Sequence, residues 1–349
     1  MINDREWAHL EPASAAQSQY FDDAYTQTAE ARQLLSRPAS DYLRLPFRDL
    51  DRMVGGIAPG DVWFLASFSG NGKTSLLMSL VLRLLGAGRT VFYMGLESRP
   101  HILRTHLACL RLGLDVGDVL SGAARAWPNW DEKRAELLAD LEYQRLRLEG
   151  WRMIVDGRPA IDAGGVGPAL REAALHAADL VVIDHIDHLQ LGESGSVYEQ
   201  SRRVTHEILR LTQEYRLRLL IATQLNNEAA RGDRLAVYQA PQPQHVFMGA
   251  HKRMIATGML GLFRPLRGGL TKEDVAAVRS GAAEAKTILE PQTMGVVCMK
   301  HRYYGHRETA RCMLRIERGR VDDMAERDQY SAAYGHGRRR EIPERDRYR

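Results

Sequence analysis

The chain has 349 residues, of which 44% are hydrophobic and 26% charged, a composition that excludes a disordered or fibrous protein. At roughly 150 residues per domain, this length predicts about two domains. The net charge is +4, but residues 331–349 alone hold six arginines against three acids, so the rest of the chain is nearly neutral. The basic pI therefore does not by itself indicate nucleic-acid binding, which has to be argued from local residues.

Membrane and secretory classes are disfavoured as well. No apolar run approaches the ~20 residues needed to cross a bilayer, and the polar, acid-containing N-terminus is unlike a signal or transit peptide. The three cysteines, Cys109, Cys298 and Cys312, have neither pairing parity nor metal-ligand spacing. We therefore expect a cytoplasmic or nucleoid-associated protein with no membrane partner, in a reducing compartment.

The chain divides into three predicted parts. Residues 1–40 form an N-terminal extension with one helix over 14–35, which Ser14 can cap with Gln17 as its return partner. A single compact domain is expected over 41–322. Residues 323–349 are predicted to be a basic, flexible tail.

Strands and helices alternate within the compact domain. Short apolar runs predict strands at 62–66, 91–94, 153–155, 180–183, 219–222, 259–263 and 296–299. Helical patterns are expected at 75–88, 99–112, 130–147 and 197–215, with a further helical insertion over 268–286. This alternation predicts an α/β fold with a mostly parallel sheet covered by helices on both faces.

The strongest motif is SFSGNGKTS, at residues 67–75, between a predicted buried strand and a predicted helix. Small residues let backbone N–H groups turn around phosphates, a lysine supplies charge at the β- and γ-phosphates, and a hydroxyl can bind Mg²⁺. Ser67 replaces the usual first glycine of this pattern. The predicted ATP-binding residues are Ser69, Gly70, Asn71, Gly72, Lys73, Thr74 and Ser75.

A second motif, LVVIDHIDHLQL, ends a predicted buried strand in Asp184. A carboxylate there would reach the carboxyl edge of the sheet, where Mg²⁺ would lie beside Thr74. Asp187 is expected to be a surface group or an indirect neighbour of the site. His185 and His188 are weak evidence for a further metal, because the sequence shows no other ligands at metal spacing.

Two more polar residues follow predicted strands. Glu97, in FYMGLESRP, is predicted to polarise the attacking water, although a glutamate favoured by a helix N-terminus is the alternative. Gln224, in IATQLNNEAARGD, is predicted to sense the γ-phosphate, although an ordinary polar strand end is equally consistent with the sequence.

Taken in order, these motifs resemble the C-terminal motor domain of DnaB-type replicative helicases, within the RecA-like ATPases. The resemblance covers about residues 45–315 and includes the entry segment FRDLDRMVGGIAPGD, the phosphate loop, YMGLES, VIDHIDHLQL, ATQLNN and MKHRYYG. It implies a RecA-like phosphate-loop core that uses ATP and Mg²⁺. It also implies that Lys300 and Arg302 reach the γ-phosphate bound by a neighbouring subunit in a hexameric ring. The alternative for these two residues is a pair of solvated cations at an exposed strand end.

The resemblance further implies loops that grip the phosphate backbone of single-stranded DNA. Two loops are candidates, one at 194–203 and the other at 245–253. The alternative is a solvated helix face for the first and an ordinary basic turn for the second. The predicted DNA contacts are Arg202, Arg203, Gly249, Lys252 and Arg253.

We expect no N-terminal collar domain of the kind the family has, because only about 40 residues precede the predicted core. A loader or a primase is a further expected partner. We therefore expect an ATP-dependent helicase that unwinds forked DNA as a homohexamer. One alternative is a RecA-like recombination or repair ATPase, or a DNA-binding switch, that does not unwind. Another is a scaffold that binds ATP without appreciable turnover.

Overall fold

The computed structural model describes residues 31–32, 35–146, 152–156, 158, 161–189, 196–226, 241–247, 249–264, 276, 280, 292–307 and 310–324. Nearly all of the predicted helix over 14–35, the insertion over 268–286 and the tail beyond residue 324 lie outside these ranges. The chain divides into two units, Met1–Tyr42 and Leu43–Arg349. The first contains a short 3₁₀ helix, η2 (Ala39–Asp41); all that follows concerns the second.

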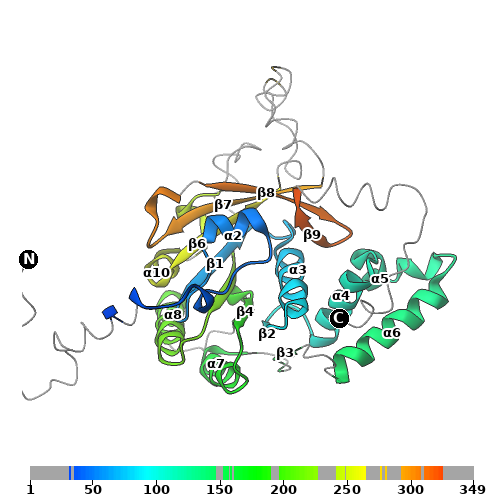
Figure 1. Cartoon of the computed structure of the whole chain (residues 1–349), viewed down its shortest axis with the longest axis horizontal. Helices are drawn as coiled ribbons and strands as arrows, with labels where there is room; N and C mark the ends of the chain where they lie inside the picture. Colours follow the sequence, from blue (N-terminus) through cyan, green and yellow to red (C-terminus); the bar gives the residue numbers. More distant parts are fainter. Residues whose placement is uncertain are drawn as a thin grey trace, which may run out of the picture. The chain divides into compact units, whose positions relative to one another are not determined.

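A nine-stranded sheet forms the centre of this unit, in the order β3-β2-β4-β5-β1-β6-β7-β8-β9 (Figure 1). The strands from β3 to β6 in that order pair in parallel, whereas β6 to β9 pair antiparallel. Their bounds are β1 (Val62–Ser67), β2 (Thr90–Gly95), β3 (Arg152–Val155), β4 (Leu180–Asp184), β5 (Leu219–Gln224), β6 (Gly258–Phe263), β7 (Thr293–His301), β8 (Arg311–Glu317) and β9 (Arg320–Asp323). All seven predicted strands are present, and the predicted α/β class is confirmed.

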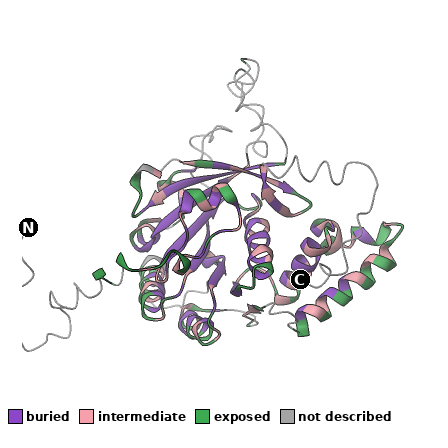
Figure 2. Ribbon diagram, in the orientation of Figure 1, coloured by how far each residue is buried: buried purple, intermediate pink, exposed green. Residues whose placement is uncertain are grey.

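The central strands are apolar throughout because both of their faces are covered. In β1, Trp63 and Leu65 pack into one hydrophobic cluster, whereas Val62, Phe64 and Ala66 pack into a second cluster. Successive side chains of a strand point to opposite faces, so the two clusters lie on the two sides of the sheet. Figure 2 shows these strands as almost entirely buried.

Helices complete both clusters. The first includes residues of α2, α3, α4 and α6, and the second includes residues of α7, α8 and α10. The helices are α2 (Arg48–Val54), α3 (Lys73–Gly86), α4 (Pro100–Leu112), α5 (Val116–Ser121), α6 (Trp130–Leu146), α7 (Val166–Leu175), α8 (Val197–Glu214) and α10 (Gly249–Ile255); the short 3₁₀ helices are η3 (Ala123–Ala126), η5 (Ala163–Gly165), η6 (Ile186–His188), η7 (Pro243–His245) and η9 (Gly305–Arg307).

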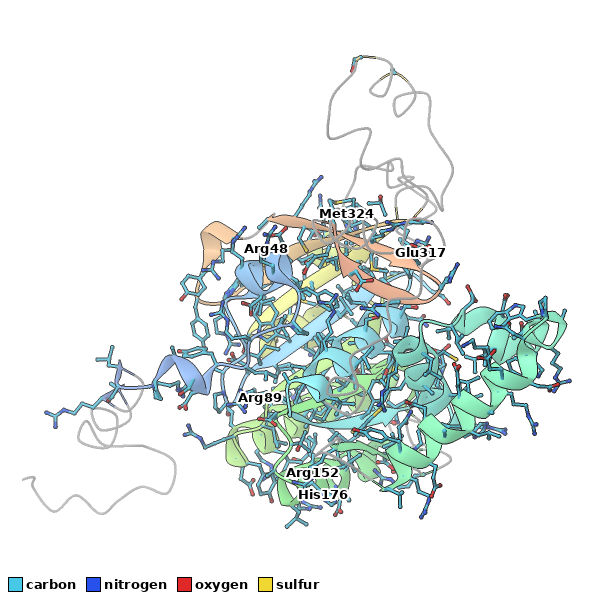
Figure 3. All side chains as sticks on the ribbon, turned by 45° about the vertical axis from the view of Figure 1, so that its right-hand side comes forward. Arg48, Arg89, Arg152, His176, Glu317 and Met324 are labelled. Atoms are coloured by element: carbon cyan, nitrogen blue, oxygen red, sulfur yellow. The ribbon has the colours of Figure 1, made fainter. Side chains whose placement is uncertain are left out.

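The antiparallel edge was not predicted beyond β7. Strand β8 alternates buried and more exposed residues, as expected of a strand with one covered face, and β9 pairs with it. The backbone N–H of Arg48 donates to Asp323 at 3.1 Å, which ties the start of α2 to the end of β9. Figure 3 labels Arg48 and Met324 at this edge. None of the described helices combines the length and apolar character that a membrane span requires.

Candidate nucleotide site

The phosphate loop lies between β1 and α3, as the motif predicts. Gly70 and Gly72 have φ values of 73° and 95°, in the left-handed region that glycine adopts without strain, and Gly72 caps the N-terminus of α3. A helix N-terminus presents free N–H groups and a partial positive charge, which suits a phosphate. Ser69 and Gly70 are exposed at the loop surface, whereas Asn71 is buried beneath it.

Lys73 is the first residue of α3 and is 7% exposed. Its ammonium folds back on the loop, where it donates to the carbonyl and the hydroxyl of Ser67, each at 3.2 Å. Burial lowers the pKa of Lys73, and the nearby carboxylates of Asp184, Glu97 and Asp187 oppose this shift. The cation is therefore held by weak neutral acceptors that a phosphate could replace.

The hydroxyl of Thr74 donates to Oδ2 of Asp184 at 2.9 Å, which brings together the two residues predicted to bind Mg²⁺. The Tyr93 hydroxyl donates to the same oxygen at 2.8 Å. Asp184 is 2% exposed, and its Oδ1 atom has no hydrogen-bond partner among the described residues. A buried carboxylate with one unpartnered oxygen beside a threonine hydroxyl fits a Mg²⁺ ion, which prefers oxygen ligands. Burial raises the pKa of Asp184, while the Tyr93 and Thr74 hydroxyls lower it.

Glu97 lies just beyond the end of β2, and its side chain is 53% exposed. The backbone N–H groups of Leu96 and Glu97 reach the Asp184 carbonyl at 2.8 and 3.4 Å, so this turn is tied to the end of β4. The Glu97 carboxylate lies 3.4 Å from Nε2 of His185. The three strand ends that carry Glu97, Asp184 and Gln224 therefore meet at one edge of the sheet, next to the phosphate loop.

Gln224 ends β5, and its side-chain amide lies 3.1 Å from Nε2 of His185. His185 itself is 1% exposed and follows Asp184 through a cis peptide bond. Glu97, His185 and His188 place one potential metal-ligand atom each within 4.8 Å of one another. The sequence alone suggested only the two histidines as metal ligands, and the structure adds Glu97 as a third. However, the side-chain amide of Gln224 lies 3.1 Å from Nε2 of His185, where a metal ion would have to bind.

Asp187 was expected to be a surface group or an indirect neighbour of the site, and the structure places it among buried groups next to the site. Its side chain is 9% exposed and lies 2.5 Å from the ammonium of Lys252. Burial alone would raise the pKa of Asp187, but His185, Lys252 and the Gln224 N–H together hold it well below its usual range. Asp187 is therefore an ionised, buried carboxylate.

The predicted DNA contacts are corrected in two respects. Lys252 lies on α10 instead of a loop, and its side chain is 3% exposed because the ammonium is paired with Asp187, so it does not present a charge to DNA. Arg202 and Arg203 are exposed but lie on α8, not in the predicted loop. Gly249 begins α10, and Arg253 on the same helix is partly exposed.

Lys300 and Arg302 lie at and just after the end of β7, beside the C-terminal turn of α10. The Lys300 ammonium donates to the carbonyl of Arg253, and to that of Ala256 at 2.9 Å. The Arg302 guanidinium donates to the carbonyl of Met254 at 3.0 Å. The three acceptor carbonyls belong to α10 and to the residue just after it.

Sequence reasoning missed two contributors to this site. Tyr93 lies inside β2, where its aromatic ring gave only a strand signal and its hydroxyl gave none. The pairing of Asp187 with Lys252 joins residues 65 positions apart, which spacing in the sequence does not predict.

A parallel sheet with a phosphate loop after β1 and a buried aspartate at the end of β4 defines a RecA-like phosphate-loop ATPase fold. The model of the DnaB-like helicase C-terminal domain matches residues 43–236, more than half of the chain. The chain therefore belongs to the DnaB-like helicase C-terminal domain family. This match includes Lys73, Glu97, Asp184 and Gln224 but ends before Lys300.

Two solved structures have the same fold. One is a DnaB-like replicative helicase, described with its interactions with primase. It is 13% identical to this chain with a TM-score of 0.64, and the alignment covers 89% of this chain and 69% of that one. The other is described as an ATPase domain, with 15% identity and a TM-score of 0.64, over 87% of this chain and 100% of that one. No curated protein matches the sequence.

Proposed function

We propose that this chain is an ATP-dependent DNA helicase that works in the cytoplasm as a homohexameric ring on single-stranded DNA. The observation that carries the proposal is the Thr74–Asp184 contact of 2.9 Å at the mouth of the phosphate loop, with one Asp184 oxygen left unpartnered among the described residues. Family membership supports both the ATPase and the helicase assignments.

In the proposed mechanism, the phosphate loop binds the triphosphate of ATP. Lys73 leaves the Ser67 oxygens and moves to the β- and γ-phosphates, where its ammonium pairs with negative charge instead of neutral oxygens. Mg²⁺, held by Thr74 and Asp184, would neutralise charge on the phosphate oxygens. Glu97 accepts a proton from the attacking water, for which its half-exposed carboxylate at the site edge is suited.

The remaining groups act after phosphoryl transfer begins. Gln224, at the end of β5, responds to loss of the γ-phosphate. Lys300 and Arg302 of one subunit complete the site of the next, where a cation stabilises the charge that develops on the transferred group. In this ring, Arg202, Arg203 and Arg253 are the exposed or partly exposed cations proposed to contact the DNA backbone.

The proposal is tested by ATP-dependent unwinding of a forked duplex, with Lys73→Ala as the inactive control. Lys133→Ala is the matched control, because Lys133 pairs with Glu136 at 2.7 Å on α6. We expect the wild type and Lys133→Ala to unwind DNA and Lys73→Ala to be inactive. ATP hydrolysis stimulated by single-stranded DNA without unwinding would instead identify a recombination-type ATPase or a translocase, and tight ATP binding without hydrolysis would identify a scaffold.

A further inference from the structure

The buried side chain of Lys252 connects helix α10 by hydrogen bonds to the nucleotide site of its own subunit. The Lys252 ammonium lies 2.5 Å from Oδ1 of Asp187, 2.7 Å from the Thr223 hydroxyl and 2.9 Å from the Phe247 carbonyl. An ammonium has three protons, so these three acceptors use all of them. Lys252 is therefore committed to contacts inside the subunit.

Asp187 extends this contact toward the predicted catalytic groups. Its Oδ2 atom accepts the backbone N–H of Gln224 at 2.7 Å and the Thr223 hydroxyl at 2.8 Å, and lies 3.5 Å from Nδ1 of His185. The other ring nitrogen of His185, Nε2, lies 3.1 Å from the side-chain amide of Gln224.

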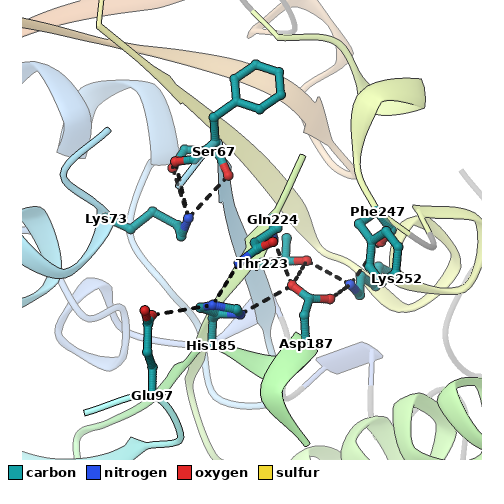
Figure 4. A network of polar contacts seen from close by, with 10 residues as sticks. Ser67, Lys73, Glu97, His185, Asp187, Thr223, Gln224, Phe247 and Lys252 are labelled. Carbon is teal, nitrogen blue, oxygen red and sulfur yellow. Dashed lines mark hydrogen bonds and ion pairs between the residues drawn. The ribbon is translucent and has the colours of Figure 1, made fainter. Parts of the chain in front are cut away.

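His185 also touches Glu97, at 3.4 Å between Nε2 and Oε2. Figure 4 shows the resulting continuous series of contacts, from Lys252 through Asp187 and His185 to Gln224 and Glu97. His185 and Lys252 are both nearly inaccessible to solvent, so water does not compete for these groups. Through Asp187, the backbone of Gln224 is thus linked to the position of α10.

The last turn of α10, which also carries Lys252, is hydrogen-bonded to the two cations predicted to act on the neighbouring subunit. Lys300 donates to the carbonyls of Arg253 and Ala256, and Arg302 donates to that of Met254. These carbonyls belong to the last turn of α10 and the residue just after it. A cation at a helix C-terminus is favoured by the free carbonyls and the helix dipole. A phosphate that draws these cations away would remove this stabilisation.

We propose that α10 couples the nucleotide site of its own subunit to that of the neighbouring subunit, with Lys252 as the positioning residue for Gln224. The inference rests on the proposed function, because the action of Lys300 and Arg302 on a neighbour belongs to it. When ATP occupies the neighbouring site, its γ-phosphate competes with the α10 carbonyls for both cations. The released helix then shifts Lys252, and with it Asp187, His185 and the Gln224 amide.

A purely structural role for the Lys252–Asp187 pair makes different predictions. A buried pair that only holds the fold would affect stability, and any loss of turnover would follow the loss of folded protein. A positioning pair affects kcat of the folded protein while ATP affinity stays nearly unchanged, because Lys252 makes its contacts with Asp187, Thr223 and Phe247 and not with the phosphate loop.

The experiment compares steady-state ATP hydrolysis and ATP affinity in the wild type, Lys252→Met and the double variant Lys252→Met/Asp187→Asn. Methionine keeps the length of the lysine stem without the charge. Asparagine keeps an acceptor for the Gln224 N–H and also removes the charge, so the double variant contains no unpaired buried ion and should fold. Lys133→Met removes the surface ion pair with Glu136 and serves as the matched control.

We expect both Lys252 variants to lose about tenfold or more in kcat, with Kd for ATP within about threefold of the wild type, and the Hill coefficient for ATP to approach one. Lys133→Met should match the wild type. Wild-type kcat in Lys252→Met, or in the double variant if the single variant does not fold, would overturn the inference and leave the proposed function intact. Absence of hydrolysis in the wild type would overturn both.

Discussion

Two buried aspartates, Asp184 and Asp187, should respond in opposite ways to replacement by asparagine. Thr74 and Tyr93 both donate to the same oxygen of Asp184, and its other oxygen has no hydrogen-bond partner among the described residues. An asparagine carbonyl can accept both hydroxyls, and the neutral amide removes a charge whose pKa is raised by burial. Asp184→Asn should therefore stabilise the nucleotide-free protein.

The expected magnitudes follow from the surroundings of each carboxylate. Neutralising a buried functional carboxylate commonly adds about 1 kcal/mol to the free energy of unfolding, or roughly 2–4 °C in Tm for a chain of this size. Asp187→Asn has the opposite effect, because it leaves the Lys252 ammonium, with its side chain 3% exposed, without its buried counter-charge. Removing one partner of a buried ion pair costs about 3–5 kcal/mol.

Thermal and urea unfolding of the nucleotide-free variants, together with their ATP hydrolysis, test this reasoning. Asp184→Asn should unfold at a higher temperature than the wild type and hydrolyse ATP roughly 10²–10³-fold more slowly, because several kcal/mol of charge stabilisation by the metal are lost. A lower Tm for Asp184→Asn would refute the argument, since it would mean that the buried charge stabilises the fold. Equal Tm changes for the two variants would refute it as well.

Three further predictions concern other parts of the site and the core. Lys73→Ala should lower kcat for ATP by at least about 10²-fold, measured by phosphate release, because the charge at the γ-phosphate is lost. Gly72→Ala should destabilise the protein by about 1–3 kcal/mol in urea unfolding, since φ is 95° and the added Cβ would lie 2.7 Å from the Met294 side chain. The pKa of His106 is lowered by burial from 6.5 to about 4, so its neutral form stabilises the fold. Its contribution, about 3 kcal/mol, is complete above pH 6.5 and is lost progressively as the pH falls to 4, and His106→Gln should flatten the pH dependence of urea unfolding.

Each of these predictions has an outcome that contradicts it. Hydrolysis by Lys73→Ala at the wild-type rate would remove the phosphate-loop assignment. Wild-type stability of Gly72→Ala would mean that α3 can begin with a side chain at its cap. If His106→Gln and the wild type lost stability equally between pH 6.5 and 4, the acid sensitivity would have to come from other groups.

The parallel half of the fold and the phosphate loop were predictable because their signals are local. Strand β1 is apolar at every position but its last, Ser67, and the loop that follows it carries Gly72, Lys73 and Thr74 in consecutive positions. The carboxyl ends of parallel strands meet at one edge, so the proximity of Asp184, Glu97 and Gln224 follows from topology. Their chemical roles stay predictions until activity is measured.

The unpredicted parts depend on contacts that are distant in sequence. Helix α10 has seven residues, too few to show a helical period, and it begins with Gly249, so the segment resembles a loop. Lys252 resembles a surface cation because only the folded chain brings Asp187, 65 residues away, to its ammonium. Strands β8 and β9 belong to the antiparallel edge, where polar residues alternate with buried ones and the apolar run that marks β1 is missing.

The central claim is that ATP is hydrolysed at a site built by Lys73, Asp184 and Glu97 of one subunit and completed by Arg302 of the next. The most direct measurement mixes two inactive variants, Lys73→Ala and Arg302→Ala, and follows ATP hydrolysis on single-stranded DNA. A subunit with an intact phosphate loop can then lie beside a subunit with an intact Arg302, so the mixture should regain activity that neither variant has alone. If the mixture stays inactive although the two variants assemble together, or if Arg302→Ala alone is fully active, the shared site is contradicted.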